Sequence, residues 1–332
     1  MELDALDRKI LYQLDTDAQQ TISNIARETN LSKEVTRYRI KKLEDTHIIQ
    51  KYFAILNTAA LNFTIFKVLV RLQNITSEKR KVFINRLIAT PEVNWITSMD
   101  GEYNIGITFL IRDVISFQKI LDEIFSDFHS LIGKRIMSIN VSGEYLTRDY
   151  LITDDLVKRK RRAYSYMAPE ERSERVNEKE EAILSKLCQS ARMPISEIAE
   201  ETGLTPKIVR YQIKKIRKRN ILKYSNIILN TEAVGIIHYK VLFYLKQSTK
   251  KRFDEFYSYC HRLPNVVYII SCIGPWNVEL DVEIDDIIKF RELINQITQE
   301  FTDIIQDYTQ LYIYEIHKYS LYPDTTGIGT KD

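Results

Sequence analysis

The sequence predicts an α+β fold present twice in one chain. Each copy is expected to hold a winged helix-turn-helix, followed by a ferredoxin-like β-α-β-β-α-β domain. Two observations predict this. The chain repeats itself with a shift of 173 residues, and 12 of 23 positions are identical when Thr21–Leu43 is aligned with its copy. Within each copy, helical periodicity gives way to short apolar runs separated by turns.

Three helices are expected at the start of each copy. In the first copy, one face of the first helix is apolar: Leu6, Ile10, Leu11 and Leu14. A second short helix ends at Asn30, and Ser32 can cap a third helix that runs to about Leu43. In the second copy Thr205 and Pro206 are a capping hydroxyl and a first-turn proline, and the helix runs to about Ile216. Two short helices joined by a tight turn form a helix-turn-helix.

The second part of each copy has the order β-α-β-β-α-β. In the first copy the strands are expected at 66–72, 93–99, 104–111 and roughly 136–141, with helices at 77–89 and along the apolar face from Val114 to Phe128. In the second copy the last strand covers roughly 309–316. The two helices cover one face of the sheet, and the other face is also largely apolar. We expect the sheet of the other copy to cover it; the alternative is a wet face rich in aromatic residues.

We expect six segments along the chain. They are helix-turn-helix 1 (1–56), ferredoxin-like domain 1 (57–147), a charged linker (148–175), helix-turn-helix 2 (176–229), ferredoxin-like domain 2 (230–322) and a tail (323–332). The linker contains five consecutive basic residues, Lys158 to Arg162. They are interpreted either as a solvated segment or as a phosphate contact that is independent of DNA sequence.

Composition excludes several classes of protein. Hydrophobic residues make up 44% and charged residues 28% of the chain, and the net charge of +3 leaves only a local surface for nucleic acid. No apolar run approaches the ~18 residues of a membrane span, and the first residues lack a signal-peptide core. The three cysteines and five histidines show no metal-site spacing, so we expect no metal and no cofactor. We expect a cytoplasmic, nucleoid-associated protein.

The third helix of each copy carries a basic outward face. In the first copy the face and its start comprise Lys33, Glu34, Arg37, Tyr38, Lys41 and Lys42; in the second they comprise Lys207, Arg210, Tyr211, Lys214 and Lys215. Basic helix faces are usually only solvated. Here the face lies on the second helix of a helix-turn-helix, where DNA is read, and it occurs in both copies. Arginine and lysine suit guanine edges and phosphates, so we predict binding to double-stranded DNA.

These motifs resemble the Lrp/AsnC family of feast/famine transcription regulators. The resemblance rests on "LDALDRKIL", on "NIARETNLSKEVTRYRIKKLEDTHIIQKY", and on the turns "DGEYNIGI" and "IGPWNVEL". It implies that each ferredoxin-like part is the family's RAM domain. It further implies self-association through the RAM sheets, here as an intramolecular pseudo-dimer, with a higher oligomer as the open alternative. It also implies an amino acid or another small effector near the turns, at Gly101, Tyr103, Asn104, Gly274, Trp276 and Asn277.

The sequence departs from the family pattern at several positions. His47 and Asn220 stand where a glycine with positive φ is common, and both residue types tolerate that conformation. Asn104 and Asn277 replace an aspartate, and an asparagine offers a ligand ammonium only a neutral carbonyl. The opening helix of the second copy, "NEKEEAIL", is only loosely typical. A tight hairpin without any ligand also explains Gly101 and Gly274, and this structural role is the favoured one.

Two other functions stay open beside a transcription regulator that is not an enzyme. The same pair of folds occurs in sirohaem decarboxylases, which can also be fused; that function requires histidines and arginines around a tetrapyrrole. In the second copy His238 and Lys240 lie on a predicted strand, but the first copy has Ile65 and Lys67 there, so only the lysine recurs. The third possibility is an amino-acid sensor that acts through protein partners and does not bind DNA.

Overall fold

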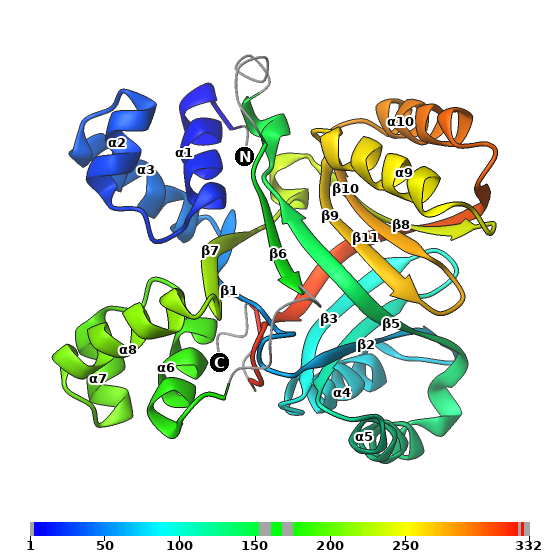
Figure 1. Ribbon diagram of the computed structural model, residues 1–332, viewed down its shortest axis with the longest axis horizontal. Coiled ribbons are helices and arrows are strands. Elements are labelled where there is room, and N and C mark those ends of the chain that lie inside the picture. The colour runs from blue at the N-terminus through cyan, green and yellow to red at the C-terminus, as the bar shows by residue number, and fades with distance from the viewer. Residues whose placement is uncertain (1–2, 153–160, 168–174, 325–326, 329–332) are drawn as a thin grey trace.

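The computed structural model describes residues 3–152, 161–167, 175–324 and 327–328. Two helical lobes lie on one side of the molecule, and the strands with the remaining helices lie on the other (Figure 1). None of the helices in the described part of the chain has the length and the apolar character needed to span a bilayer.

Each lobe contains three helices, and their first residues are related by the 173-residue shift of the sequence repeat. In the first lobe they are α1 (Ala5–Thr16), α2 (Ile22–Thr29) and α3 (Lys33–Asp45). In the second they are α6 (Glu178–Gln189), α7 (Ile195–Thr202) and α8 (Pro206–Lys218).

Local backbone signals explain where these helices begin and end. The side chains of Ser32 and Thr205 each accept a hydrogen bond from a first-turn N–H of α3 and α8, which confirms the predicted caps. After α3 and α8 the chain turns at His47 (φ 55°) and Asn220 (φ 62°). The two residues therefore take the positive φ that the family places on glycine, as predicted.

The strands of the two ferredoxin-like parts also follow the repeat. In the first copy they are β2 (Thr64–Leu72), β3 (Val93–Asp100), β4 (Ile105–Ile111) and β5 (Ile132–Leu146), with helices α4 (Ser77–Ile88) and α5 (Val114–Asp127). In the second copy they are β8 (Ile237–Leu245), β9 (Val266–Ile273), β10 (Val278–Ile284) and β11 (Ile305–Tyr319), with helices α9 (Lys250–Arg262) and α10 (Ile287–Glu300). The last strands are longer than predicted.

The extra length of β5 and β11 joins the two copies. One end of β5 pairs with β2 of its own copy and the other end pairs with β9 of the second copy. Likewise β11 pairs with β8 and then with β3. The strand order β2-β4-β3-β11-β8-β10-β9-β5 thus closes on itself through β2 and β5. The inner faces of both sheets are enclosed, so the prediction that each copy covers the other is confirmed.

A second sheet links the helical lobes. β1 (Ile49–Leu56) pairs antiparallel with β7 (Leu222–Leu229) of the other copy, and we call this two-stranded sheet the ribbon. Ile227 and Leu229 of β7 are buried in the core of the first lobe, and Phe53 of β1 is buried with the second lobe. Each lobe therefore completes its core with a strand of the other copy.

The predicted linker is partly packed onto this frame. Residues Ala163–Met167 form β6, which pairs with the end of β5. Arg161 donates hydrogen bonds to the carbonyls of Thr147, His261 and Leu263, which fixes the segment to the second copy. A solvated linker is therefore wrong for the described residues 161–167, because backbone pairing and a buried guanidinium hold them. Residues 158–160 of the basic run lie outside the described residues.

Candidate nucleic-acid interface

The predicted recognition helices α3 and α8 present their basic faces to solvent. Tyr38 is 69% exposed and Tyr211 is 65% exposed, although tyrosine commonly buries its ring. Most of the other predicted DNA-contact residues are also exposed: Lys33, Glu34, Arg37, Lys41, Lys42, Lys207, Arg210 and Lys214. The exception is Lys215, which is half-buried. The opposite faces are held by Thr36, Ile40 and Leu43 in α3, and by Val209 and Ile216 in α8, all buried. The sides predicted to point inward and outward are therefore confirmed for both helices.

Lys215 differs from its counterpart Lys42. Its ammonium lies 3.0 Å from a carboxylate oxygen of Glu180, a buried residue at the start of α6. Burial alone would raise the pKa of Glu180, but hydrogen bonds from Arg219 and Lys215 outweigh it and lower the pKa. In the first lobe Asp7 takes the place of Glu180, and it is paired with Arg39 instead. Lys215 therefore helps to hold its own lobe together.

The two recognition helices differ at their starts. Glu34 is acidic where the second copy has Lys207, and Val35 stands where the second copy has Ile208. Backbone and Ser32 hydrogen bonds at the helix start lower the pKa of Glu34, so it carries its negative charge at neutral pH. Arg39, which is Gln212 in the second copy, is tied to Asp4 and Asp7 at 2.7 Å each. The charge at the second position of the helix is thus reversed between the two copies.

The two predicted effector turns make a close approach to the opposite copy. Gly101 has φ +134°, and a Cβ there would lie 2.9 Å from the side chain of Leu311 and 3.1 Å from the carbonyl of Gln310, both on β11. Gly274 has φ +155°, and its Cβ would meet Ser138 of β5 at 2.9 Å. Both glycines are therefore required by the backbone conformation and by contact with the other copy.

The remaining turn residues are also occupied within the protein. The Asn104 side chain accepts a hydrogen bond from the N–H of Leu72 and donates one to its carbonyl. Asn277 accepts one from the N–H of Leu245, while Trp276 and Tyr103 are buried. The structure does not bring the two turns together, because Gly101 packs on β11 and Gly274 on β5.

A buried charged cluster between the sheets was missed from the sequence. Lys67 on β2 forms an ion pair with Glu279 on β10, and Lys240 on β8 lies 3.2 Å from Glu279 and 2.7 Å from Asp281. Burial alone would raise the pKa of Glu279, but the two ammonium groups outweigh it and lower the pKa. Both lysines also lie over the ring of Trp95, at 5.5 and 5.2 Å from its centroid. The inner face is largely apolar as expected, with Ile65, Leu69 and Leu242 buried beside these lysines, but the charged cluster within it was not expected.

A second buried cluster connects the closed sheet to the first lobe. The guanidinium of Arg148 donates two hydrogen bonds to Glu283, at 2.7 and 2.9 Å, and one to Asp15 of α1 at 2.5 Å. Tyr145 and Tyr150 donate further hydrogen bonds to Asp15 and Glu283 respectively. The carboxylates hold the pKa of Arg148 well above its ordinary value despite burial. This cluster fixes the lobe against the second copy's sheet.

The sequence did contain a signal for these clusters. Glu279, Asp281 and Glu283 alternate along β10, so that all three point to one face of the strand. Three acidic residues on one face of a predicted central strand indicate either an exposed face or buried partners. Lys67 and Lys240 recur under the 173-residue shift, but the sequence alone does not pair them with these acids.

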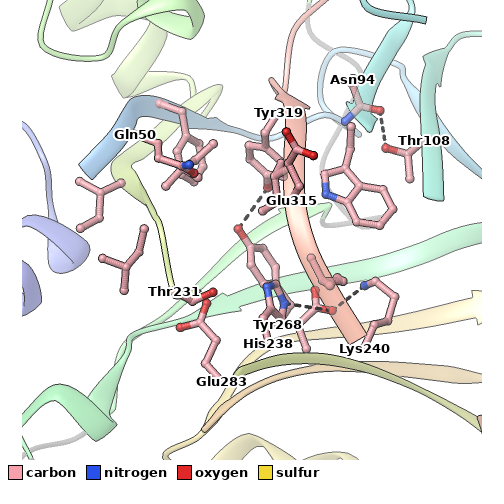
Figure 2. Close-up of a pocket in the computed structure, with 18 of the residues that line it drawn as sticks. Gln50, Asn94, Thr108, Thr231, His238, Lys240, Tyr268, Glu283, Glu315 and Tyr319 are labelled. Carbon is pink, nitrogen blue, oxygen red and sulfur yellow. Dashed lines mark hydrogen bonds and ion pairs between the residues drawn. The ribbon is translucent and has the colours of Figure 1, made fainter. Parts of the chain in front are cut away.

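Between the ribbon and the inside of the closed sheet lies a cavity of about 380 Å³. Figure 2 shows side chains from several strands around it, among them His238, Lys240, Tyr268, Glu315 and Tyr319. Nε2 of His238 makes no hydrogen bond, although the residue is only 7% exposed, and an Asp281 oxygen lies 3.7 Å from it. The cavity is thus lined by both copies and by the ribbon.

Comparisons with known proteins agree with the repeat. Residues 3–50 match a family model described as winged helix-turn-helix DNA-binding, and residues 182–224 match one described as bacterial regulatory protein, arsR family. The chain is 31% identical over 122 residues to the Bkd operon transcriptional regulator of Pseudomonas aeruginosa, covering 36% of this chain and 79% of that protein. It is 30% identical over 124 residues to the leucine-responsive regulatory protein of Rhizobium meliloti, covering 37% and 80%.

One solved structure resembles the whole arrangement. The sirohaem decarboxylase NirDL covers 98% of this chain and 95% of its own chain, with a TM-score of 0.60 and 13% sequence identity. At this identity the likeness concerns the fold. It extends over both copies, whereas each of the two regulators named above matches little more than a third of the chain.

Proposed function

This chain belongs to the Lrp/AsnC family of transcription regulators, and from that premise we propose that it binds double-stranded DNA and regulates transcription. The observation that carries the proposal is the pair of exposed basic helices α3 and α8. Each is the second helix of a helix-turn-helix, which in this class of motif enters the major groove. Each presents an exposed tyrosine beside arginine and lysine, the residue types that contact phosphates and guanine.

The chain acts in this proposal as a fused pseudo-dimer. The closed sheet and the ribbon hold two recognition helices in one polypeptide, so that one chain supplies both halves of a dimeric reader. Half-sites for such readers lie about one helical turn, ~34 Å, or a multiple of it apart. Because Glu34 faces DNA where the second copy has Lys207, the two half-sites differ and the operator is an imperfect palindrome.

An amino-acid effector at the two glycine turns remains a prediction of the family resemblance. The hydrogen bonds of Asn104 and Asn277 to neighbouring backbone leave little of these amides for a ligand. An effector there would bind to the surface of the turns and act by moving one copy against the other. Calorimetry with leucine and methionine, in wild type and in Asn104→Ala, tests this part separately from DNA binding.

The second candidate is an enzyme acting on a tetrapyrrole, which the whole-chain likeness to the sirohaem decarboxylase favours. The cavity argues against it on size and charge. At about 380 Å³ it is at the small end of ligand sites. Its lining cations Lys67, Lys240 and Arg148 are already paired with carboxylates, whereas the lining acids Glu232 and Glu315 remain exposed and would repel the carboxylates of a tetrapyrrole. Incubation with an iron tetrapyrrole is expected to leave the ligand's visible spectrum unchanged. A shifted absorption band with one tetrapyrrole per chain would support the enzyme.

Fluorescence anisotropy tests DNA binding. The full chain is titrated against DNA enriched from a random pool, over a series of salt concentrations. We expect specific binding that weakens steeply with salt, and a loss of affinity and a shallower salt dependence in Arg37→Ala/Arg210→Ala. The control Lys81→Ala/Lys119→Ala removes two exposed charges from α4 and α5 and is expected to bind as wild type does. Failure to enrich any sequence, or equal binding by both double variants, would refute the proposed interface.

A further inference from the structure

The cavity under the ribbon belongs to neither the recognition helices nor the glycine turns. At about 380 Å³ it has room for roughly a dozen water molecules, or for one small ligand. Gln50 of β1 and Thr231 and Glu232 after β7 line its ribbon side, while His238 and Asp281 line its inner side. Figure 2 shows Gln50 and Thr231 on one flank of this space and Asn94 and Thr108 on the other.

The charges around the cavity are unequal. Each of its cationic side chains already has a carboxylate partner: Lys67 with Glu279, Lys240 with Asp281 and Arg148 with Glu283. Glu232 and Glu315 are lining residues that remain exposed. A ring nitrogen of His317 lies 3.5 Å from Glu315, but burial lowers the pKa of His317, so this neighbour is neutral at pH 7. The exposed part of the lining therefore has an excess of negative charge.

The inner surface suits an organic cation. Aromatic side chains line it: Phe53, Trp95, Tyr166, Tyr268 and Tyr319. Faces of aromatic rings attract cations, and the ring of Trp95 already receives the ammonium groups of Lys67 and Lys240. Nε2 of His238 is buried at this surface and makes no hydrogen bond, and an oxygen of Asp281 lies 3.7 Å from it, so an imidazole nitrogen and a carboxylate line the cavity side by side.

We infer that this cavity binds one small organic cation per chain, an amine with an apolar body. One site is expected, because its histidine and its lining acids come from the second copy. Under the 173-residue shift, His238, Asp281 and Glu283 correspond to Ile65, Thr108 and Leu110, and the acidic Glu232 and Glu315 correspond to Ala59 and Ser142. The duplication thus supplies the enclosure, and the divergence of the copies supplies the ligand groups.

The position of the cavity couples such a ligand to the helical lobes. Gln50 lies on β1, and Thr231 follows directly on β7, so the ligand contacts the ribbon that joins the two lobes. A ligand held between the ribbon and the closed sheet favours one arrangement of the lobes over others. This regulatory consequence rests on the proposed DNA-binding function, whereas binding of the amine does not.

Isothermal titration calorimetry of the full chain without DNA tests the site. The probe is 2-phenylethylamine, compared with its neutral analogue 2-phenylethanol and the anionic 3-phenylpropionate. We expect the amine to bind with a stoichiometry of one, and the alcohol and the acid to bind at least about tenfold more weakly. No heat with the amine at millimolar concentration, two sites per chain, or equal binding of the acid would overturn the inference.

Two variants test the named residues. Glu232→Gln/Glu315→Gln alters only exposed side chains, and it is expected to weaken amine binding roughly three- to tenfold. The matched control Glu78→Gln/Glu300→Gln removes two exposed acids, from α4 and α10, that do not line the cavity, and it is expected to bind as wild type does. His238→Ile installs the first copy's residue and is expected to weaken binding with an unchanged melting temperature. Unchanged affinity in both cavity variants would contradict the assigned site.

A final measurement separates the two proposals. DNA anisotropy is repeated with the amine and with the alcohol at equal concentration. A change in DNA affinity with the amine alone supports the coupling. If the amine binds in calorimetry but the chain does not bind DNA, the proposed function is refuted and the amine site stands. If the chain binds DNA but the amine gives no calorimetric binding, the amine site is refuted and the proposed function stands.

Discussion

Lys67 of the first copy and Glu279 of the second form an ion pair inside the closed sheet, with both side chains almost fully buried. Glu279 also accepts a hydrogen bond from the indole of Trp276 and lies 3.2 Å from Lys240. A single carboxylate therefore neutralises charge from both copies at the centre of the molecule. Its counterpart in the first copy is Gly106, so the cluster depends on the divergence of the two copies.

Glu279→Gln is expected to destabilise the fold by about 3–5 kcal/mol, because it leaves the ammonium of Lys67 buried without its carboxylate. Chemical denaturation followed by circular dichroism measures this change. Lys67→Met in the same chain removes the uncompensated charge, and the double variant is expected to recover part of the loss. A loss below about 1 kcal/mol in the single variant would show that the pair is not buried in solution.

Gly101→Ala and Gly274→Ala are expected to destabilise the protein by more than the cost of a positive φ. The new methyl group would meet Leu311 or Ser138 at 2.9 Å on the opposite copy. Gly203→Ala and Gly235→Ala are controls without a steric contact, because both have positive φ, at +67° and +73°, but nothing lies within 4 Å of the added Cβ. Their cost is expected to be about 1–2 kcal/mol, the strain of the left-handed conformation alone.

The free energies of unfolding of these four variants are compared by urea titration. An excess loss at Gly101 and Gly274 measures together the contact of each turn with the other copy and the greater backbone strain of a φ of +134° or +155°. Equal losses at all four positions would mean that the contact relaxes without cost.

Lys42→Ala and Lys215→Ala are expected to separate DNA contact from stability. Lys42 is exposed on α3, so its removal lowers DNA affinity, reduces the salt slope by about 1 and leaves the melting temperature unchanged. Lys215 holds Glu180, which keeps Arg219 as a second partner, so its removal costs up to about 1 kcal/mol of stability. Thermal melting and anisotropy on the same preparations check both. A loss of DNA affinity in Lys215→Ala together with a loss of stability in Lys42→Ala would place Lys215, and not Lys42, at the DNA.

The stability of the protein is expected to rise between about pH 8 and pH 10 through Lys318. Its ammonium donates to the carbonyls of Ile88 and Thr90, and burial lowers its pKa to about 8. The unfolded lysine keeps an ordinary pKa near 10.4, so in this window the unfolded chain binds more protons, and raising the pH favours the folded state. The full effect is roughly 3 kcal/mol.

The check is the difference between wild type and Lys318→Met in the free energy of unfolding as a function of pH. The difference cancels the titration of the other lysines. A variant that shows the same rise between pH 8 and pH 10 as wild type would exclude Lys318 as its source.

Much of the fold follows from local signals in the sequence. The repeat predicts that every element occurs twice, and Ser32, Thr205, His47 and Asn220 mark helix starts and turns through their own backbone chemistry. Pairing between strands that are distant in sequence could not be predicted from such local signals. That β5 extends to reach β9 depends on the second copy, and no residue near β5 encodes it.

The outward faces of α3 and α8 could be predicted for the same reason, because a helical wheel depends on neighbouring residues alone. The cluster of Lys67, Lys240 and Glu279 could not, since its members are far apart in sequence and charged residues are normally assigned to the surface. The role of Lys215 was also hidden, because its partner Glu180 lies in another helix.

The joining of β5 to β9 and of β11 to β3 within one polypeptide has a consequence for gene dosage. A regulator assembled from separate subunits must first associate, and at low abundance its active fraction falls with dilution. Here the two halves are tethered, so their meeting does not depend on how many copies the cell contains. Under the proposed function, occupancy of an unsaturated operator is then expected to grow in direct proportion to the amount of protein made.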